Sequence, residues 1–155
     1  MTQEQEQMQV EEPKEKEKSN WQPYSLDRKA QNLVLDRRDL RDVLNESHKM
    51  RMSVSYGLER FWGEHIRLQR ESQAKAMYWK AVWDDLADIL AEVDSEFQLP
   101  KDTVGADDTA KIKAISETLW KLDISQQRIA LTVLTQFCDA LVWWTQRYKK
   151  RTQGE

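Results

Sequence analysis

The stretch that decides the fold covers residues 53–97 and reads SVSYGLERFWGEHIRLQRESQAKAMYWKAVWDDLADILAEVDSEF. Its apolar side chains recur at intervals of three and four residues, which places them on one face of an α-helix. At about 100° per residue, Phe61, Trp79 and Phe97 lie directly above one another on that face. We therefore predict one helix over about 53–97, roughly 67 Å long at 1.5 Å per residue. The predicted face comprises Val54, Phe61, Leu68, Ser72, Trp79, Trp83, Leu86, Leu90, Val93 and Phe97.

A break inside this stretch is the alternative. The apolar stripe turns polar at Ser72 and Lys75, within the segment RESQAKA at residues 70–76. Gly57 and Gly63, near the start of the stretch, also disfavour an uninterrupted helix. The sequence therefore leaves open whether this stretch forms one helix or two.

The flanking segments are helical by the same criterion. Ser25 is a suitable N-cap, and apolar residues at helical spacing follow it over about 26–51. A loop is predicted at 98–107, where proline, aspartate and glycine favour turns.

Two helices are predicted after that loop. Asp107 or Asp108 caps a short helix that ends near Leu122. Asp123, with Gln126 three residues later, has the pattern of a capping box and begins the last helix. The buried face of this last helix comprises Ala130, Val133, Leu134, Phe137, Leu141, Trp144 and Tyr148.

The composition favours helix throughout. The 155 residues include only 4 glycines and 3 prolines, and 33% of them are charged. We predict an all-α fold, an antiparallel helical bundle of four to five helices built around the long helix at about 53–97. Residues 21–151 form a single domain, preceded by a disordered, acidic, Gln-rich tail at 1–20 and followed by a flexible C-terminus at 152–155.

Several features favour a cytoplasmic protein. The one cysteine, Cys138, cannot form an internal disulfide, so nothing suggests an oxidising compartment. The N-terminal residues lack the basic and apolar stretches of a signal peptide. The most apolar stretch, at 129–144, is shorter than the ~20 residues that span a bilayer, so we expect no membrane segment.

Charge is distributed unevenly along the chain. There are 24 basic and 27 acidic side chains, a net charge of -3. Residues 1–20 hold three lysines and six glutamates, which account for all of that charge, and the rest of the chain is neutral overall. A neutral body argues against strong nonspecific binding of nucleic acid, which requires cations that neutralise phosphates.

The residue types that usually carry catalysis form no established motif. His48 and His65 have no carboxylate or cysteine at the spacing of metal ligands, and Cys138 lies among apolar residues that disfavour a thiolate. Four scattered glycines cannot form a phosphate-binding loop. We therefore predict no enzyme activity, metal, cofactor or small-molecule ligand.

One acidic motif supports an alternative. Asp84, Asp85 and Asp88 spell DDLAD, which has the DDxxD spacing of prenyl-transferring enzymes. Carboxylates four residues apart share a helix face and can hold Mg²⁺ with a diphosphate. No second acidic motif accompanies them, and the chain is short for a prenyl cavity. We favour a solvated acidic face and keep a Mg²⁺-dependent diphosphate enzyme as the alternative.

The tryptophans divide into two groups. Trp79, Trp83, Trp120 and Trp144 fit the predicted core. Trp143 points about 140° away from the apolar face of the last helix, given the helical repeat.

A second group of apolar side chains also falls outside the predicted core. Trp62 and Ile66 lie about 100–140° away from the stripe of the long helix, given the helical repeat. Exposed tryptophan is typical of interface hot spots. We therefore predict that Trp62, Ile66 and Trp143 contact a protein partner, with packing inside one chain as the alternative.

Charge on the outer side of the predicted long helix is also segregated. Basic residues lie toward its N-terminal half and acidic residues toward its C-terminal half, an order that the helix dipole does not explain. An antiparallel copy of the helix would set basic against acidic halves, so we predict self-association or a partner of matching polarity. Solvation of both halves is the simpler alternative. The residues are Arg60, Arg67, Arg70, Asp84, Asp85, Asp88 and Glu92.

The leading hypothesis is thus a non-catalytic interaction or scaffold subunit that binds a protein partner or forms a homo-oligomer. The alternative is a nucleic-acid-associated subunit that holds phosphates and stacks bases. In size and helix content, and in nothing more specific, the chain is broadly similar to the small helical subunits of type III CRISPR effector complexes. Candidate nucleic-acid contacts are Arg147, Tyr148, Lys149, Lys150 and Arg151, with Arg60, Arg67 and Arg70 as a second group.

Overall fold

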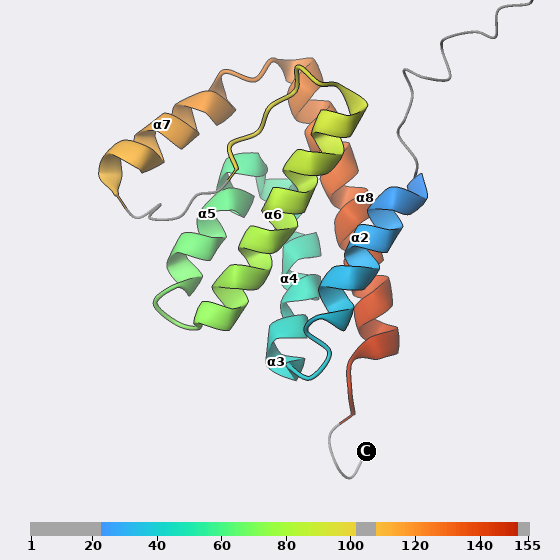
Figure 1. Cartoon of the computed structure of the whole chain (residues 1–155). Helices are drawn as coiled ribbons and strands as arrows, with labels where there is room; N and C mark the ends of the chain where they lie inside the picture. The colour runs from blue at the N-terminus through green and yellow to red at the C-terminus, as the bar shows by residue number, and fades with distance from the viewer. Residues whose placement is uncertain (1–22, 102–107, 152–155) are drawn as a thin grey trace, which may run out of the picture.

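The computed structural model describes residues 23–101 and 108–151, and every regular element within these ranges is helical (Figure 1). The predicted all-α fold is confirmed. The predicted tail at 1–20 and C-terminus at 152–155 lie outside the described residues. The elements are α2 (Pro23–Leu35), α3 (Arg41–Leu44), α4 (Glu46–Ser53), the 3₁₀ helix η1 (Val54–Tyr56), α5 (Leu58–Leu68), α6 (Gln73–Val93), α7 (Thr109–Trp120) and α8 (Ile124–Tyr148).

The predicted single helix over 53–97 is wrong, because the chain reverses between α5 and α6 to form a helical hairpin (Figure 1). Ser72, where the apolar stripe turned polar, is the N-cap of α6, and its hydroxyl accepts a hydrogen bond from the backbone N–H of Lys75 at 3.3 Å. Gly57 has a positive φ of 101°, which favours glycine and ends η1 before α5 begins. The apolar periodicity of the sequence runs through both helices because each of them directs its apolar face toward the same core.

The predicted helix over 26–51 is also divided. Residues 36–40 form a turn in which the N–H of Leu40 donates to the carbonyl of Arg37 at 2.8 Å. The charged sequence DRRD at 36–39 supplies no apolar side chain that would hold a continuous helix against the core. The turn lets α2 and α4 both pack against α8.

The two C-terminal helices begin as predicted. The side chain of Asp108 accepts from the N–H of Ala110 at 2.8 Å and caps α7. Asp123 and Gln126 form the predicted capping box, with distances of 2.8 and 3.2 Å. Because these signals depend only on neighbouring residues, sequence alone was sufficient to place them.

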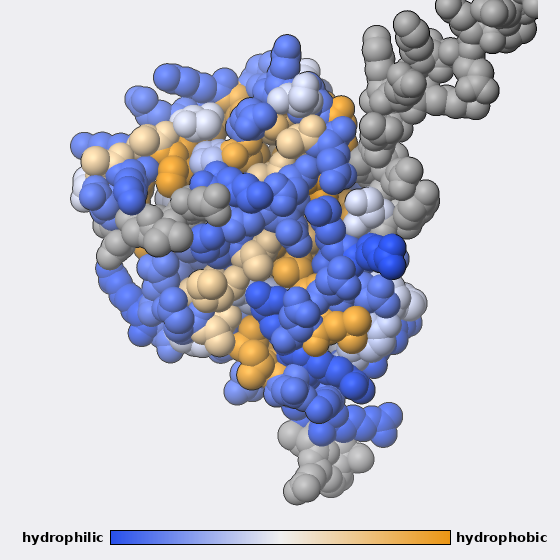
Figure 2. Space-filling model, viewed as in Figure 1, coloured by the Kyte–Doolittle hydropathy of each residue, from blue (hydrophilic) through white to orange (hydrophobic). Residues whose placement is uncertain are grey.

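The core lies between the α5–α6 hairpin and the layer formed by α2, α4 and α8. Trp79 and Trp83 are buried, as predicted, and Phe61 packs against both rings at centroid distances of 4.9 and 6.4 Å. The prediction that Trp120 is a core residue is wrong, because 72% of it is exposed at the end of α7. In Figure 2 the visible face is mostly hydrophilic, with separate apolar patches.

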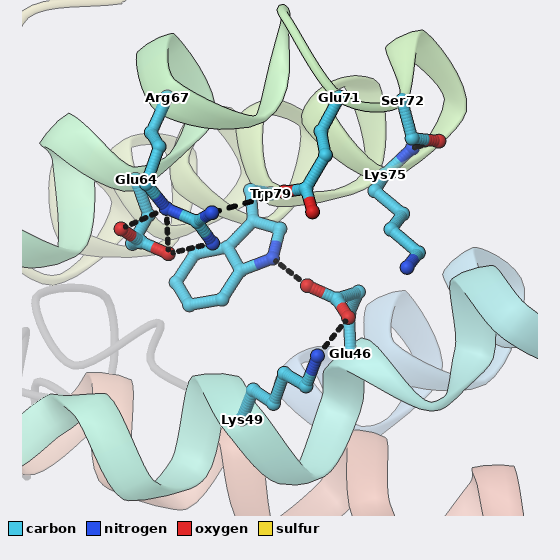
Figure 3. A network of polar contacts seen from close by, with 8 residues as sticks. All are labelled: Glu46, Lys49, Glu64, Arg67, Glu71, Ser72, Lys75 and Trp79. Carbon is cyan, nitrogen blue, oxygen red and sulfur yellow. Dashed lines mark hydrogen bonds and ion pairs between the residues drawn. The ribbon is translucent and has the colours of Figure 1, made fainter.

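Two polar contacts cross the interior. Glu46, on α4, is only 1% exposed, and its carboxylate accepts from the indole N–H of Trp79 at 3.0 Å and pairs with Lys49 at 3.2 Å (Figure 3). Elsewhere the buried hydroxyl of Ser47 lies 2.7 Å from that of Tyr78 and 2.8 Å from that of Thr145. These contacts join α4 to α6 and α8 and fix the register of the two layers.

The first prediction concerns this hydroxyl cluster. Ser47→Ala leaves the buried hydroxyls of Tyr78 and Thr145 without their shared partner, so we expect a loss of about 1–3 kcal/mol in the free energy of unfolding. Denaturant titration followed by circular dichroism measures the loss. Ser55→Ala is the matched control, because Ser55 is exposed, and its substitution is expected to cost less than about 0.5 kcal/mol. Equal stability of both variants would contradict the structural role of the cluster.

Candidate protein-binding surfaces

A hollow lies beside α5, on the side where α7 packs, with a volume of about 560 Å³. Its lining combines three apolar side chains, Trp62, Ile66 and Ile112, with three arginines. The sequence analysis had named each of these as a candidate contact except Ile112, which lies on α7. The lining residues are Glu59, Arg60, Trp62, Gly63, Ile66, Arg67, Arg70 and Ile112.

A second hollow, of about 310 Å³, adjoins the first and shares Glu59 and Arg60 with it. Two large aromatic side chains line it: Tyr56 is 65% exposed and Trp120 is 72% exposed. Its lining is completed by Gly57, Leu58, Leu119, Gln127 and Leu131. We name the two adjoining hollows together the α5–α7 face.

The charges of the α5–α7 face are only partly neutralised. Arg67 pairs with Glu64 and Glu71, each at 2.9 Å, and these glutamates raise the pKa of the Arg67 guanidinium (Figure 3). Arg60 lies over the ring of Tyr56 at 5.7 Å. Among the described residues, neither Arg60 nor Arg70 forms an ion pair. Two guanidinium groups therefore remain available to an incoming carboxylate or phosphate.

The prediction that Trp62 is exposed is wrong. Trp62 is 4% exposed, and its indole nitrogen has no hydrogen-bond partner among the described residues. Ile66 is half-buried and packs against the core. The sequence analysis assigned only one face of this segment to the core. In the structure α7 packs beside α5, so a second side of α5 is buried as well.

The acidic residues that were predicted to form one charged end of the long helix are distributed on α6. Asp84 pairs with Lys80 at 2.7 Å, and Asp88 pairs with Lys101 at 2.6 Å. Burial raises the pKa of Asp85, an effect that Lys29 opposes. Because α5 and α6 are separate helices, the predicted charge-segregated face of a single helix does not exist. The remaining acidic residue, Glu92, is exposed.

Two of the three DDLAD carboxylates, Asp84 and Asp88, pair with lysines. Over residues 23–101 and 108–151, no three His, Cys, Asp or Glu side chains are grouped in a way that could hold a metal ion. The geometry of the described residues therefore adds no support to the diphosphate alternative.

Trp143 is 47% exposed on α8, as its predicted position off the apolar face requires. Its ring is not bare: the guanidinium of Arg147 lies 3.6 Å from the ring centroid, and Trp144 meets it edge-on at 4.6 Å. Trp144, predicted as core, is half-buried and donates its indole N–H to Asp27 at 2.8 Å. A third hollow, of about 480 Å³, is lined by Asp27, Asp139, Ala140, Trp143 and Trp144.

The basic residues at the end of α8 hold the helix to its neighbours. Lys149 donates to the side chain of Asn45 at 2.9 Å, and Lys150 pairs with Asp39. The ring of Tyr148 stacks on Trp144 at 5.1 Å. These contacts account for three of the five residues predicted to contact nucleic acid, Arg147 covers Trp143, and Arg151 is exposed.

His65 and Cys138 are both buried. Burial lowers the pKa of His65, which is 2% exposed and whose Nδ1 lies 2.5 Å from the carbonyl of Trp62. Burial raises the pKa of the Cys138 thiol to about 12. Neither side chain lines one of the three hollows described above.

The comparisons with known proteins add no identity. No family model, no curated protein and no solved structure matches this chain. Among the described residues, none of the helices is both long enough and apolar enough to cross a membrane.

The second prediction follows from the burial of His65. The folded state binds a proton at His65 less readily than the unfolded state, whose imidazole keeps the ordinary pKa of 6.5. The contribution of His65 to stability is therefore complete above pH 6.5 and decreases as the pH falls below that value. His65→Gln should remove this part of the pH dependence of the free energy of unfolding. His48→Gln, at an exposed position, should keep it, and identical pH profiles for the two variants would refute the assignment.

Proposed function

We propose that this chain is a non-catalytic interaction subunit that binds a protein partner through the α5–α7 face. The observation that carries the proposal is the pair of exposed aromatic side chains, Tyr56 and Trp120, that line one hollow from separate elements. Large exposed aromatic side chains at a hollow are typical of binding hot spots.

Of the two exposed tryptophans, we propose Trp120 as the anchor, on physical grounds. Among the described residues, no hydrogen bond or ring contact involves Trp120, whereas Arg147 and Trp144 already contact the ring of Trp143. Covering an uncovered indole with a partner's apolar side chain removes more surface from water. Trp143 stays a predicted contact of secondary importance.

The chemistry of the α5–α7 face defines the partner. Apolar side chains fit the hollows, and carboxylates complement Arg60 and Arg70, which form no ion pair among the described residues. Three glutamates surround the three arginines, so the face has little net positive charge. A partner segment with a few carboxylates around an apolar centre fits this pattern better than a polyphosphate chain.

The third prediction tests the anchor. Trp120→Ala should leave the helical circular-dichroism signal intact, because the side chain is exposed, and should reduce partner capture by roughly ten-fold or more, as expected for a hot spot. Capture is measured by cross-linking in native extract followed by quantitative mass spectrometry. Met77→Ala is the control, since Met77 is an exposed apolar residue that lines neither hollow of the face. Trp143→Ala should weaken capture less than Trp120→Ala.

Two results would contradict the proposal. An unchanged set of captured proteins with Trp120→Ala would exclude the α5–α7 face as the binding surface. Loss of folding in that variant would place the indole in the core. Sedimentation of the full chain at moderate and high salt determines separately whether the partner is a second copy.

The second candidate function is binding of single-stranded nucleic acid. It is favoured by one arrangement, the guanidinium of Arg60 over Tyr56 beside the exposed ring of Trp120, because stacking rings next to arginines bind unpaired bases.

The fourth prediction distinguishes the two candidates. If the protein-binding proposal is correct, the anisotropy of a fluorescent single-stranded oligonucleotide should not rise with added protein, even at low salt. If the nucleic-acid candidate is correct, the anisotropy rises, the affinity decreases steeply with salt, and Arg60→Gln with Arg70→Gln reduces the salt dependence. Arg28→Gln with Lys75→Gln, which removes two cations that line neither hollow, serves as the charge-matched control.

A further inference from the structure

Two side chains of opposite charge lie where the two hollows of the α5–α7 face adjoin. Glu59 and Arg60 are neighbours in the chain, each lines both hollows, and neither forms an ion pair among the described residues. One carboxylate oxygen of Glu59 accepts from the hydroxyl of Ser116 at 2.8 Å, which leaves the negative charge without a cation. The exposed guanidinium of Arg60 lies over the ring of Tyr56. The face therefore presents one charge of each sign, side by side.

The smaller hollow combines an exposed ring with a space that can receive one. Trp120, at the end of α7, borders this hollow of about 310 Å³ and has no hydrogen bond or ring contact among the described residues. Pockets of about 300–1,000 Å³ hold ligands larger than an indole ring, so the space is sufficient for the side chain of a tryptophan. A surface of this kind can pair with a copy of itself, because each copy supplies a ring and receives one.

Apolar surface continues from this hollow onto the start of α8. Gln127 lines the hollow, and Ile124, three residues earlier on the same side of the helix, is 67% exposed. The exposed fractions of Trp120 and Tyr56 are 72% and 65%. Because an aromatic side chain can bury about 150–250 Å², covering both rings in two copies removes roughly 600 Å² from water. That is about a third to a half of the ~1,200–2,000 Å² of a standard interface, and Ile124 adds to it.

We propose that the α5–α7 face binds the same face of a second copy of this chain, in a dimer with two-fold symmetry. This inference rests on the proposed function, because it names the partner of the same face. In a two-fold interface one patch meets itself, and every contact between two different residues occurs twice. Since Glu59 and Arg60 are adjacent, a two-fold axis beside them lets Glu59 of each copy pair with Arg60 of the other. Trp120 of each copy then enters the smaller hollow of the other.

A second copy supplies the chemistry that the face requires of its partner. It brings a carboxylate in Glu59 beside an apolar centre formed by Tyr56 and Trp120. Outside residues 1–20 the chain is neutral overall, so no net charge repulsion between the two bodies opposes their pairing. The reciprocal ion pairs lie at a surface that salt can reach, so the dimer should weaken as the salt concentration rises.

The experiment is sedimentation equilibrium of the full chain over a series of protein concentrations. We expect a reversible equilibrium between a monomer and a species of twice its mass. Trp120→Ala should raise the dissociation constant of the dimer by roughly ten-fold or more, because it removes the ring that fills the partner's hollow. Met77→Ala, at an exposed apolar position that lines neither hollow, should leave the constant unchanged.

A charge swap tests the reciprocal ion pairs. Glu59→Arg alone and Arg60→Glu alone each set like charges against each other, so either variant by itself should dimerise roughly ten-fold or more weakly. An equal mixture of the two variants sets two arginines against two glutamates and should form a mixed dimer, which native mass spectrometry identifies by its mass. Ser116→Ala, which removes only the hydrogen bond to Glu59, is the matched control and should dimerise normally. Circular dichroism of each variant verifies the fold.

Three results would overturn the inference. A chain that stays monomeric at every concentration does not bind a second copy. A dimer that Trp120→Ala leaves unchanged uses another surface. Folded charge variants that fail to form the mixed dimer exclude the reciprocal ion pairs. If the chain is monomeric and Trp120→Ala still loses captured proteins, the face binds a different protein, so the proposed function stands although this inference fails.

Discussion

Phe61 lies against Trp79 and Trp83 across the α5–α6 hairpin, and the arrangement of the other helices depends on this aromatic contact. It requires the chain to reverse between the two helices, so that residues eighteen positions apart meet ring against ring. The hairpin then presents one broad apolar surface, on which the layer of α2, α4 and α8 packs. Trp79 also donates its indole N–H to the buried carboxylate of Glu46, so the same side chain that closes the hairpin fixes the position of α4.

The way in which the long-helix prediction failed is informative. An eighteen-residue separation equals five helical turns, so Phe61 and Trp79 had the same azimuth on a hypothetical single helix. Two antiparallel helices that face each other across a core satisfy the same periodicity, because each contributes its own inward stripe. The sequence pattern therefore predicted the buried side chains of this segment more accurately than it predicted the ends of the helices. The polar positions at 70–76 contained the correct signal, since Ser72 became the N-cap of α6.

Features controlled by adjacent residues were predictable, and features controlled by distant packing were not. The capping box at Asp123 and the burial of Cys138 followed from local chemistry and helical phase. Trp62 and Trp120 were assigned to the wrong environments because their exposure depends on where α7 lies, and α7 is placed by packing on α5. Trp120 lies one residue after the buried Leu119 and therefore points about 100° away from it around the helix. This difference in direction was the signal from which the exposure of Trp120 could have been predicted.

The distribution of polar groups explains why the surface is the place to seek function. Inside, Ser47 joins Tyr78 and Thr145, and Glu46 joins Trp79. Outside, several charged side chains pair with neighbours, as Asp88 does with Lys101. The α5–α7 face combines two arginines that form no ion pair among the described residues with the exposed side chains of Tyr56 and Trp120. Exposed aromatic side chains of this kind at a hollow are the reason why we propose that a partner binds there.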